Sequence, residues 1–151
     1  MTGIKILAKN RKAGFEYFLL EKFEAGIELQ GSEIKSIRAG QVSIGEAYIQ
    51  IENLEAWLIN AHVAKYDAAS IFNHDPKRKR RLLLHKKQIN QIWNSVRQKG
   101  LTVVPTILYL SNGKAKIEIA LAKGKKMYDK RDSIARRDLE RENSRKRKIT
   151  D

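Results

Sequence analysis

The dipeptide Asn112-Gly113 places the strictest constraint on how this chain can fold. Both residues readily adopt the positive φ angles that a two-residue type I′ hairpin turn requires. Residues 102–110 before the turn are rich in β-branched and apolar side chains, and residues 114–121 after it alternate polar and apolar. The pattern predicts a long hairpin. Because Pro105 has no amide hydrogen, we expect an edge strand or a bulge there.

Shorter segments predict further strands and two helices around this hairpin. Strands are expected at residues 15–20, 27–29 (after a turn at 24–26), 48–51 and 56–59. A short helix is expected over residues 33–38, with Ser32 as its cap and Gly40 beyond its end, and apolar spacing predicts a second from Leu84 to Lys99, ended by Gly100. The sequence therefore predicts a mostly β domain with short helices. An OB-fold-like closed β-barrel is one way to remove sheet edges at this size.

The charge of the chain points to a polyanionic partner. It has 31 Lys and Arg against 17 Asp and Glu, a formal net charge of +14. It contains no cysteine, and its three histidines lie 12 and 11 residues apart in sequence, so we expect no metal site and no other cofactor. Neither a phosphate-binding glycine loop nor a membrane-spanning run is present in the sequence. We expect a cytoplasmic protein that makes no membrane contact.

The distribution of charge predicts a body at residues 1–122 and a tail at residues 123–151. The last segment carries 12 Lys and Arg, 6 Asp and Glu, and few apolar residues. Such a segment cannot bury enough apolar surface to offset the entropy of ordering, so we expect it to be flexible alone. Residues 133–142 favour a helix that would form on a partner, with Asp132 as its cap.

Three groups of cations are candidate nucleic-acid contacts. Residues 77–81 are five successive cations, which suits phosphate binding or simply a solvated loop. Lys9, Arg11 and Lys12 form either a mobile basic arm or an ordinary polar terminus. At residues 123–131, Tyr128 lies among cations, which is typical of base stacking, although the ring could instead pack on the body.

Six motifs occur in order along the chain: NRKA at 10–13, FEAGI at 23–27, GSEIKSIRAG at 31–40, NHDP at 73–76, RLLLH at 81–85 and GKKMYDKR at 124–131. Together they resemble the SsrA-binding protein family, also called small protein B. One departure lies before Tyr66, where Lys65 stands in place of the proline common in the family, which affects only the expected loop shape.

The resemblance implies an RNA-binding adaptor of OB type that is not an enzyme. Its partners would be the tRNA-like domain of transfer-messenger RNA (tmRNA) and the decoding region and mRNA channel of stalled ribosomes, where trans-translation tags the stalled peptide. The residues expected to contact RNA are Asn10, Arg11, Lys12, Glu24, Lys35, Arg38, Arg78, Arg80, Arg81 and Lys116. Those expected to contact the ribosome are Gly124, Lys125, Lys126, Tyr128, Asp129, Lys130 and Arg131.

Two rival functions are weighed against this hypothesis. A general single-stranded nucleic-acid-binding OB module would need a row of exposed aromatic rings, and aromatic residues make up only 7% of this chain. An RNA-modifying or RNA-cleaving enzyme would need converging acid and base groups. Glu24 and Glu33 could form a carboxylate pair, but acids in a basic chain more often form ion pairs or accept hydrogen bonds from a ligand.

Overall fold

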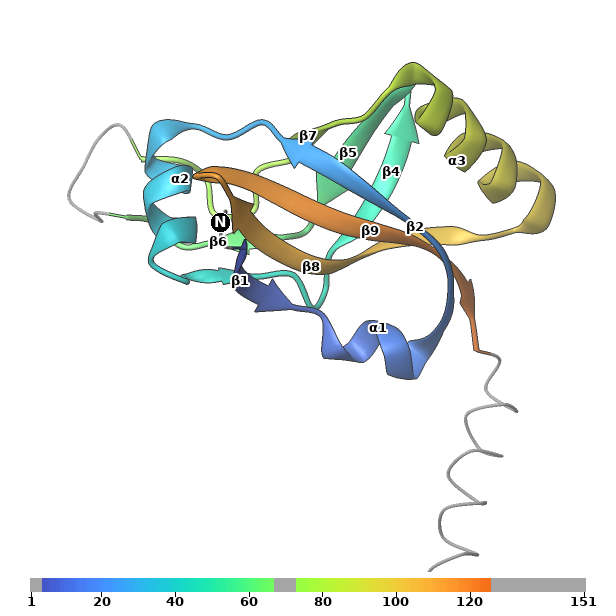
Figure 1. The fold of residues 1–151 in the computed structure, drawn as a ribbon, viewed down its shortest axis with the longest axis horizontal. Coiled ribbons are helices and arrows are strands. Elements are labelled where there is room, and N and C mark those ends of the chain that lie inside the picture. The colour runs from blue at the N-terminus through green and yellow to red at the C-terminus, as the bar shows by residue number, and fades with distance from the viewer. Residues whose placement is uncertain (1–3, 67–72, 126–151) are drawn as a thin grey trace, which may run out of the picture.

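The computed structural model describes residues 4–66 and 73–125 (Figure 1). The prediction of a mostly β domain with short helices is confirmed. The helices are α1 (Arg11–Glu16), α2 (Gly31–Arg38) and α3 (Lys86–Lys99). The strands are β1 (Ile4–Lys9), β2 (Tyr17–Ile27), β3 (Val42–Ser43), β4 (Tyr48–Glu52), β5 (Glu55–Ile59), β6 (His62–Val63), β7 (Arg80–Leu83), β8 (Thr102–Ser111) and β9 (Lys114–Gly124).

Seven of these strands form one antiparallel sheet in the order β1-β8-β9-β2-β7-β5-β4, and β3 pairs separately with β6. The sheet is strongly curled. The curl brings β4, at one end of the strand order, into contact with β8, which lies near the other end. Within the described residues no strand ladder joins β1 to β4. The closed barrel that we expected is therefore not formed as a hydrogen-bonded cylinder, and the sheet keeps two edge strands.

The β8–β9 hairpin forms as the sequence predicts. Asn112 and Gly113 have φ of 54° and 76°, the sign that a type I′ turn needs at both positions. The ladder runs back from Ser111 paired with Lys114, and its register shifts after Pro105, which confirms the expected bulge. The β1 ladder ends with Lys9 opposite Ile107, so Pro105 lies at a bulge in a stretch of β8 whose only ladder partner is β9.

The N-terminal segment departs from the prediction. Residues 4–9 do not form a mobile arm but pair with β8 as β1. The side chain of Asn10 accepts a hydrogen bond from the Ala13 amide at 3.2 Å and so caps α1. The capped helix extends to Glu16. It therefore includes Phe15 and Glu16, which we expected in a strand.

Strand β2 is longer than expected. The predicted turn at residues 24–26 is wrong, because β2 continues through them to Ile27. Gly26 pairs with Lys116 of β9 on one side and with Leu83 of β7 on the other. The two ladders hold this segment extended, and the expected separate strand at 27–29 is only its end.

The core lies inside the curled sheet, beneath α2 and α3. Alternate residues of β8 and β9, among them Val103, Leu108 and Ile117, point into it and are nearly inaccessible to solvent. Helix α3 adds Ile92 to this cluster and ends at Gly100, whose φ of 63° is the left-handed conformation expected of a glycine helix stop. None of the described helices is long and apolar enough to span a membrane.

A buried ion pair attaches α2 to β7. The side chains of Glu33 and Arg80 are both 0% exposed, with Arg80 Nε 2.5 Å from Glu33 Oε2. Arg80 gives its other four N–H groups to backbone carbonyls of Ala61 and of Asp75, Pro76 and Arg78. All five donors of the guanidinium are therefore used inside the protein.

The Glu33 carboxylate has further partners. It accepts hydrogen bonds from the Arg78 guanidinium at 2.6 Å and from the Gln30 amide at 2.8 Å. Burial alone would raise the pKa of Glu33, but the hydrogen bonds from Arg78 and Gln30 and the charge of Arg80 hold that pKa below its ordinary value.

The start of α2 differs from the prediction. The helix begins at Gly31, and its capping residue is Gln30 and not Ser32. Ser32 instead lies 2.8 Å from the buried ring of His74.

Replacing Glu33 by Gln should destabilise the fold by ~3–5 kcal/mol at neutral pH, because Arg80 would keep a buried charge with no counter-ion. The pKa of Glu33 is lower in the folded state than in the unfolded state. Its contribution to the free energy of unfolding is therefore fully present above the unfolded-state pKa, and it is lost as the pH falls through the folded-state pKa. Urea unfolding of both proteins across the acid range should show the difference in unfolding free energy shrinking on acidification.

The matched control is Glu52→Gln, which breaks the exposed pair of Glu52 with Lys79. That change should cost at most about 1 kcal/mol. Equal losses in the two variants would contradict a special role for the buried pair.

Candidate nucleic-acid interface

Glu24, Tyr109 and Lys116 meet on the outer face of the sheet. They come from three neighbouring strands, β2, β8 and β9, and Tyr109 is paired directly with Lys116. The Tyr109 hydroxyl donates to one oxygen of the Glu24 carboxylate, and Lys116 Nζ lies 3.0 Å from the other. The Glu24 side chain remains 57% exposed, so this oriented carboxylate is open to a ligand.

The protonation states of this trio are set by its contacts. The hydrogen bonds from Tyr109 and then from Lys116 lower the pKa of Glu24, so the carboxylate stays ionised at neutral pH. Burial and the neighbouring Glu24 raise the pKa of Tyr109, so its hydroxyl remains a donor. An ionised carboxylate only accepts hydrogen bonds, and each of its oxygens has a lone pair beyond the one already used. Glu24 can therefore accept from the amino group of a base or from a ribose hydroxyl.

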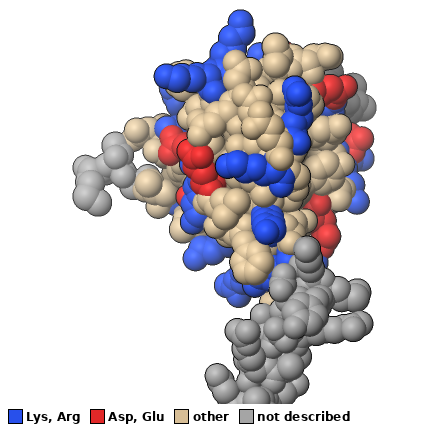
Figure 2. Space-filling model, turned by 90° about the vertical axis from the view of Figure 1, so that its right-hand side faces the viewer, with Lys and Arg blue, Asp and Glu red and all other residues tan. Residues whose placement is uncertain are grey.

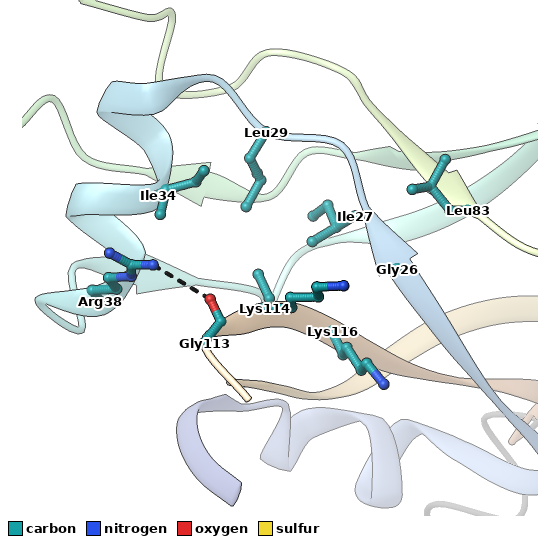
Figure 3. Close-up of a pocket in the computed structure, with 10 residues that line it drawn as sticks. Gly26, Ile27, Leu29, Ile34, Arg38, Leu83, Gly113, Lys114 and Lys116 are labelled. Carbon is teal, nitrogen blue, oxygen red and sulfur yellow. Dashed lines mark hydrogen bonds between the residues drawn. The ribbon is translucent and has the colours of Figure 1, made fainter. Parts of the chain in front are cut away.

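A pocket of about 330 Å³ opens beside Lys116, between β2, α2 and the β8–β9 turn (Figure 3). Its walls are mainly aliphatic, with Ile27, Leu29 and Ile34 facing the start of β9. Cationic side chains stand at its border. Arg38, at the end of α2, donates to the carbonyl of Gly113 at 3.3 Å, and Lys114 and Lys116 follow on β9.

The basic run at residues 77–81 is divided by the structure. It is not one loop, because Arg80 and Arg81 belong to β7, in which alternate side chains face inward and outward. Arg80 is buried and its donors are all occupied, so none is left for RNA. Arg78 is 31% exposed and bound to Glu33, while Arg81 is 46% exposed, 3.4 Å from Glu55. Lys79 Nζ lies 4.6 Å from the centre of the Trp57 ring.

The residues expected to contact RNA near the N-terminus have mixed surroundings. Asn10 uses its side chain within the protein, accepting from Ala13 and donating to the Pro105 carbonyl at 2.9 Å. Arg11 is exposed at the start of α1, and Lys12 is exposed and pairs with Glu46. Lys35, exposed on α2, lies 5.5 Å from the centre of the Tyr66 ring.

The expected tail contacts are only partly described. Gly124 ends β9 in a pair with Tyr17, and the amide of Lys125 donates to the Glu16 carbonyl at 3.0 Å. Strand β9 thus runs two residues past the predicted boundary at 122. The Lys125 ammonium lies 5.1 Å from the centre of the exposed Phe18 ring. The predicted helix at 133–142 and five of the expected contacts lie outside the described residues: Lys126, Tyr128, Asp129, Lys130 and Arg131.

Cations are spread over the surface around the end of β9. Figure 2 shows Lys and Arg side chains across this face, with a smaller number of acidic ones. Among residues 4–66 and 73–125, no group of three His, Asp or Glu side chains is arranged to hold a metal ion. The described surface offers charge, hydrogen-bond acceptors and an apolar pocket, which suit binding of a folded polyanion.

Sequence reasoning missed Tyr109 and Lys114. The position of the Asn112-Gly113 turn could have located both residues, because it fixes which residues of β8 and β9 are paired. A two-residue loop at Asn112-Gly113 pairs Ser111 with Lys114, so counting two residues further along each strand places Tyr109 opposite Lys116. The same count puts Lys114 and Lys116 on one face of β9, where both border the pocket.

Comparison with known proteins gives consistent matches. The chain is 51% identical over 138 residues to the SsrA-binding protein of Desulforudis audaxviator, covering 91% of this chain and 90% of the relative. It is 52% identical over 146 residues to the SsrA-binding protein of Persephonella marina, covering 97% and 96%.

A solved structure described as "tmRNA-SmpB: a journey to the center of the bacterial ribosome" contains a similar chain. The TM-score is 0.68 at 42% sequence identity, and the match covers 83% of this chain and 92% of the other. The sequence profile described as SmpB protein matches residues 7–149. Together with the relatives' identity over nearly their full length, this match shows that the chain belongs to the SmpB protein family.

Proposed function

We propose that this protein binds tmRNA through its tRNA-like domain and brings it to stalled ribosomes for trans-translation. The observation that carries the proposal is the exposed Glu24 carboxylate, oriented by Tyr109 and Lys116 beside a pocket bordered by cations. The relatives named SsrA-binding protein and the chain from the tmRNA-SmpB structure support the choice of RNA. The protein acts as a binding adaptor and not as an enzyme, in the cytoplasm.

The surface that we assign to RNA follows from the placement of the side chains. Lys116, Arg38 and Glu24 form its centre, with phosphates contacted by the outward-facing cations around it. Arg80 is left out, because its guanidinium is saturated inside the protein. The curled sheet serves as an OB-type scaffold that presents this face. The remaining proposed contacts are Asn10, Arg11, Lys12, Lys35, Arg78 and Arg81.

A general single-strand-binding role fits the described surface less well. Such proteins stack successive bases on a line of exposed aromatic rings. The exposed aromatic rings in the described part of the chain are Phe15, Phe18, Tyr48 and Tyr66, which belong to α1, β2, β4 and the segment after β6. They form no row along one strand, so recognition would depend on phosphates and the shape of a folded RNA.

Replacing Glu24 by Gln should weaken binding of a tmRNA transcript by ~1.5–3 kcal/mol, because a charged acceptor for base or ribose donors is lost. Charge alone predicts the opposite, since removing an acid from a basic surface favours a polyanion. Equilibrium titration measures the affinity directly. Glu28→Gln is the matched control: Glu28 is exposed and 4.0 Å from Arg81, and its loss should leave affinity equal or slightly higher. Tighter binding by Glu24→Gln would refute the orienting role.

Replacing Tyr109 by Phe should shift the acid limit of RNA binding to higher pH. The Tyr109 hydrogen bond is the largest cause of the lowered pKa of Glu24, so its removal lets that pKa rise and the carboxylate protonate sooner on acidification. Affinity measured from pH 7 downward should therefore fall earlier in Tyr109→Phe than in the wild-type protein. Tyr48→Phe, on β4, should follow the wild-type profile. Coincident profiles for Tyr109→Phe and wild type would show that the hydroxyl does not hold the carboxylate ionised.

A protein ending at Lys125 should fold and bind tmRNA like the full chain but fail to support peptide tagging on stalled ribosomes. This end point keeps the pairing of Gly124 with Tyr17 and the bond from Lys125 to Glu16. Thermal unfolding, RNA titration and reconstituted tagging measure the three properties. If RNA affinity were lost as completely as tagging, the segment would belong to the tmRNA site and the proposed division would be wrong.

A further inference from the structure

The pocket occupies a fork between two strand ladders. Strand β2 pairs with β9 as far as Gly26 opposite Lys116, and with β7 through Gly26 opposite Leu83 and Ile27 opposite Leu82. Beyond Gly26, β2 follows β7 and leaves the first residues of β9, and α2 closes the far side of the gap (Figure 3). A depression bounded on three sides by regular elements is thereby held open by backbone pairing.

The chemistry of the pocket changes from inside to outside. Ile27, Leu29, Ile34 and Ala115 supply aliphatic walls, and Leu83, which is 51% exposed, stands at one side. The charged groups of the lining, Arg38, Lys114 and Lys116, are all cations. A ligand that fits this arrangement has one part that can be buried against aliphatic walls and an attached anionic part. An unstacked nucleotide has both, because its base can be buried while its phosphate stays at the rim.

We propose that this pocket receives one unstacked base of the bound RNA, with the adjoining phosphates on Arg38 and Lys114. The inference rests on the proposed function and adds to it a contact that reads an unpaired nucleotide. Its volume of about 330 Å³ is at the lower end of the range for small-ligand pockets, which suits a single base. Gly26 contributes a wall without a side chain: a Cβ there would lie 3.3 Å from the Leu83 Cβ and crowd the opening.

Filling the pocket should weaken RNA binding without changing its salt dependence. In Ile34→Trp the larger ring takes the space of the base, and Ala115→Leu narrows the same space from β9. Each should lower affinity for a tmRNA transcript by roughly 10- to 150-fold, the range expected when the apolar surface of one base is no longer buried. The slope of log affinity against log salt should stay at the wild-type value, because every phosphate keeps its cation. Leu20→Trp, at an exposed position near the other end of β2, is the matched control and should bind normally.

The rim cations should give the reverse signature. The double variant Arg38→Gln and Lys114→Gln should flatten the salt slope by about 1.4 to 1.8, which is roughly 0.7–0.9 for each phosphate that is no longer neutralised. Chemical probing of base edges with dimethyl sulfate and carbodiimide identifies the base. One unpaired base protected by the wild-type protein should become reactive with Ile34→Trp, while the other protections remain.

The outcomes separate the two proposals. If the wild-type protein fails to bind the transcript, the proposed function is wrong and this inference falls with it. If the wild-type protein binds and both filled variants, shown by thermal unfolding to be folded, bind equally well with unchanged base protections, only the base pocket is refuted. A lower affinity accompanied by a flatter salt slope in the filled variants would also refute it, because the loss would then come from displaced phosphates.

Discussion

The buried pair of Glu33 and Arg80 is the interaction on which the rest of this structure depends. Arg80 binds carbonyls from two segments, at Ala61 and at residues 75–78, while Glu33 fixes the start of α2. Removing two charges from water is costly, and only full hydrogen bonding of both groups makes the pair tolerable. With every donor used, the pair permits one relative position of α2 and β7. Both elements line the pocket described above. The buried Glu33–Arg80 pair therefore sets the width of that pocket, although neither side chain is exposed to solvent.

The proposed RNA surface shows how a sheet can turn an acid into a specificity element. Register places Glu24, Tyr109 and Lys116 together from segments 85 and 92 residues apart in sequence. The neighbouring cations attract phosphate, an attraction that would act on any nucleic acid. The fixed carboxylate of Glu24 among these cations reduces the attraction for phosphate. It favours an RNA that places a hydrogen-bond donor opposite the carboxylate. Attraction and selection are thus carried by different residues on one face.

The parts of the fold that depend on residues close together in sequence could mostly be predicted, and the parts that depend on distant contacts could not. The Asn112-Gly113 turn and the Gly100 stop use backbone conformations that few residues take, so the β8–β9 hairpin and α3 could be placed from sequence. Arg80 could not be distinguished from its cationic neighbours, because only the inward alternation of β7 and a distant Glu33 make it a core residue. Phe15 and Glu16 were misassigned because the Asn10 cap outweighs strand preference. The order of six motifs indicated the family. The roles of individual residues in RNA binding stay predictions, since local patterns do not show which face a ligand covers.

Strand β9 runs unbroken from Lys116, at the proposed RNA surface, to Gly124, which adjoins the start of β2. Eight residues at ~3.3 Å each place the two ends roughly 26 Å apart. The strand therefore works as a ruler between the point where RNA would be held and the point where the C-terminal segment departs. Inserting a single residue without a bulge would turn every later side chain to the opposite face, so in a regular ladder this distance changes in steps of two residues, ~7 Å. A sheet thus fixes a working distance in coarse increments, which a flexible linker could not do.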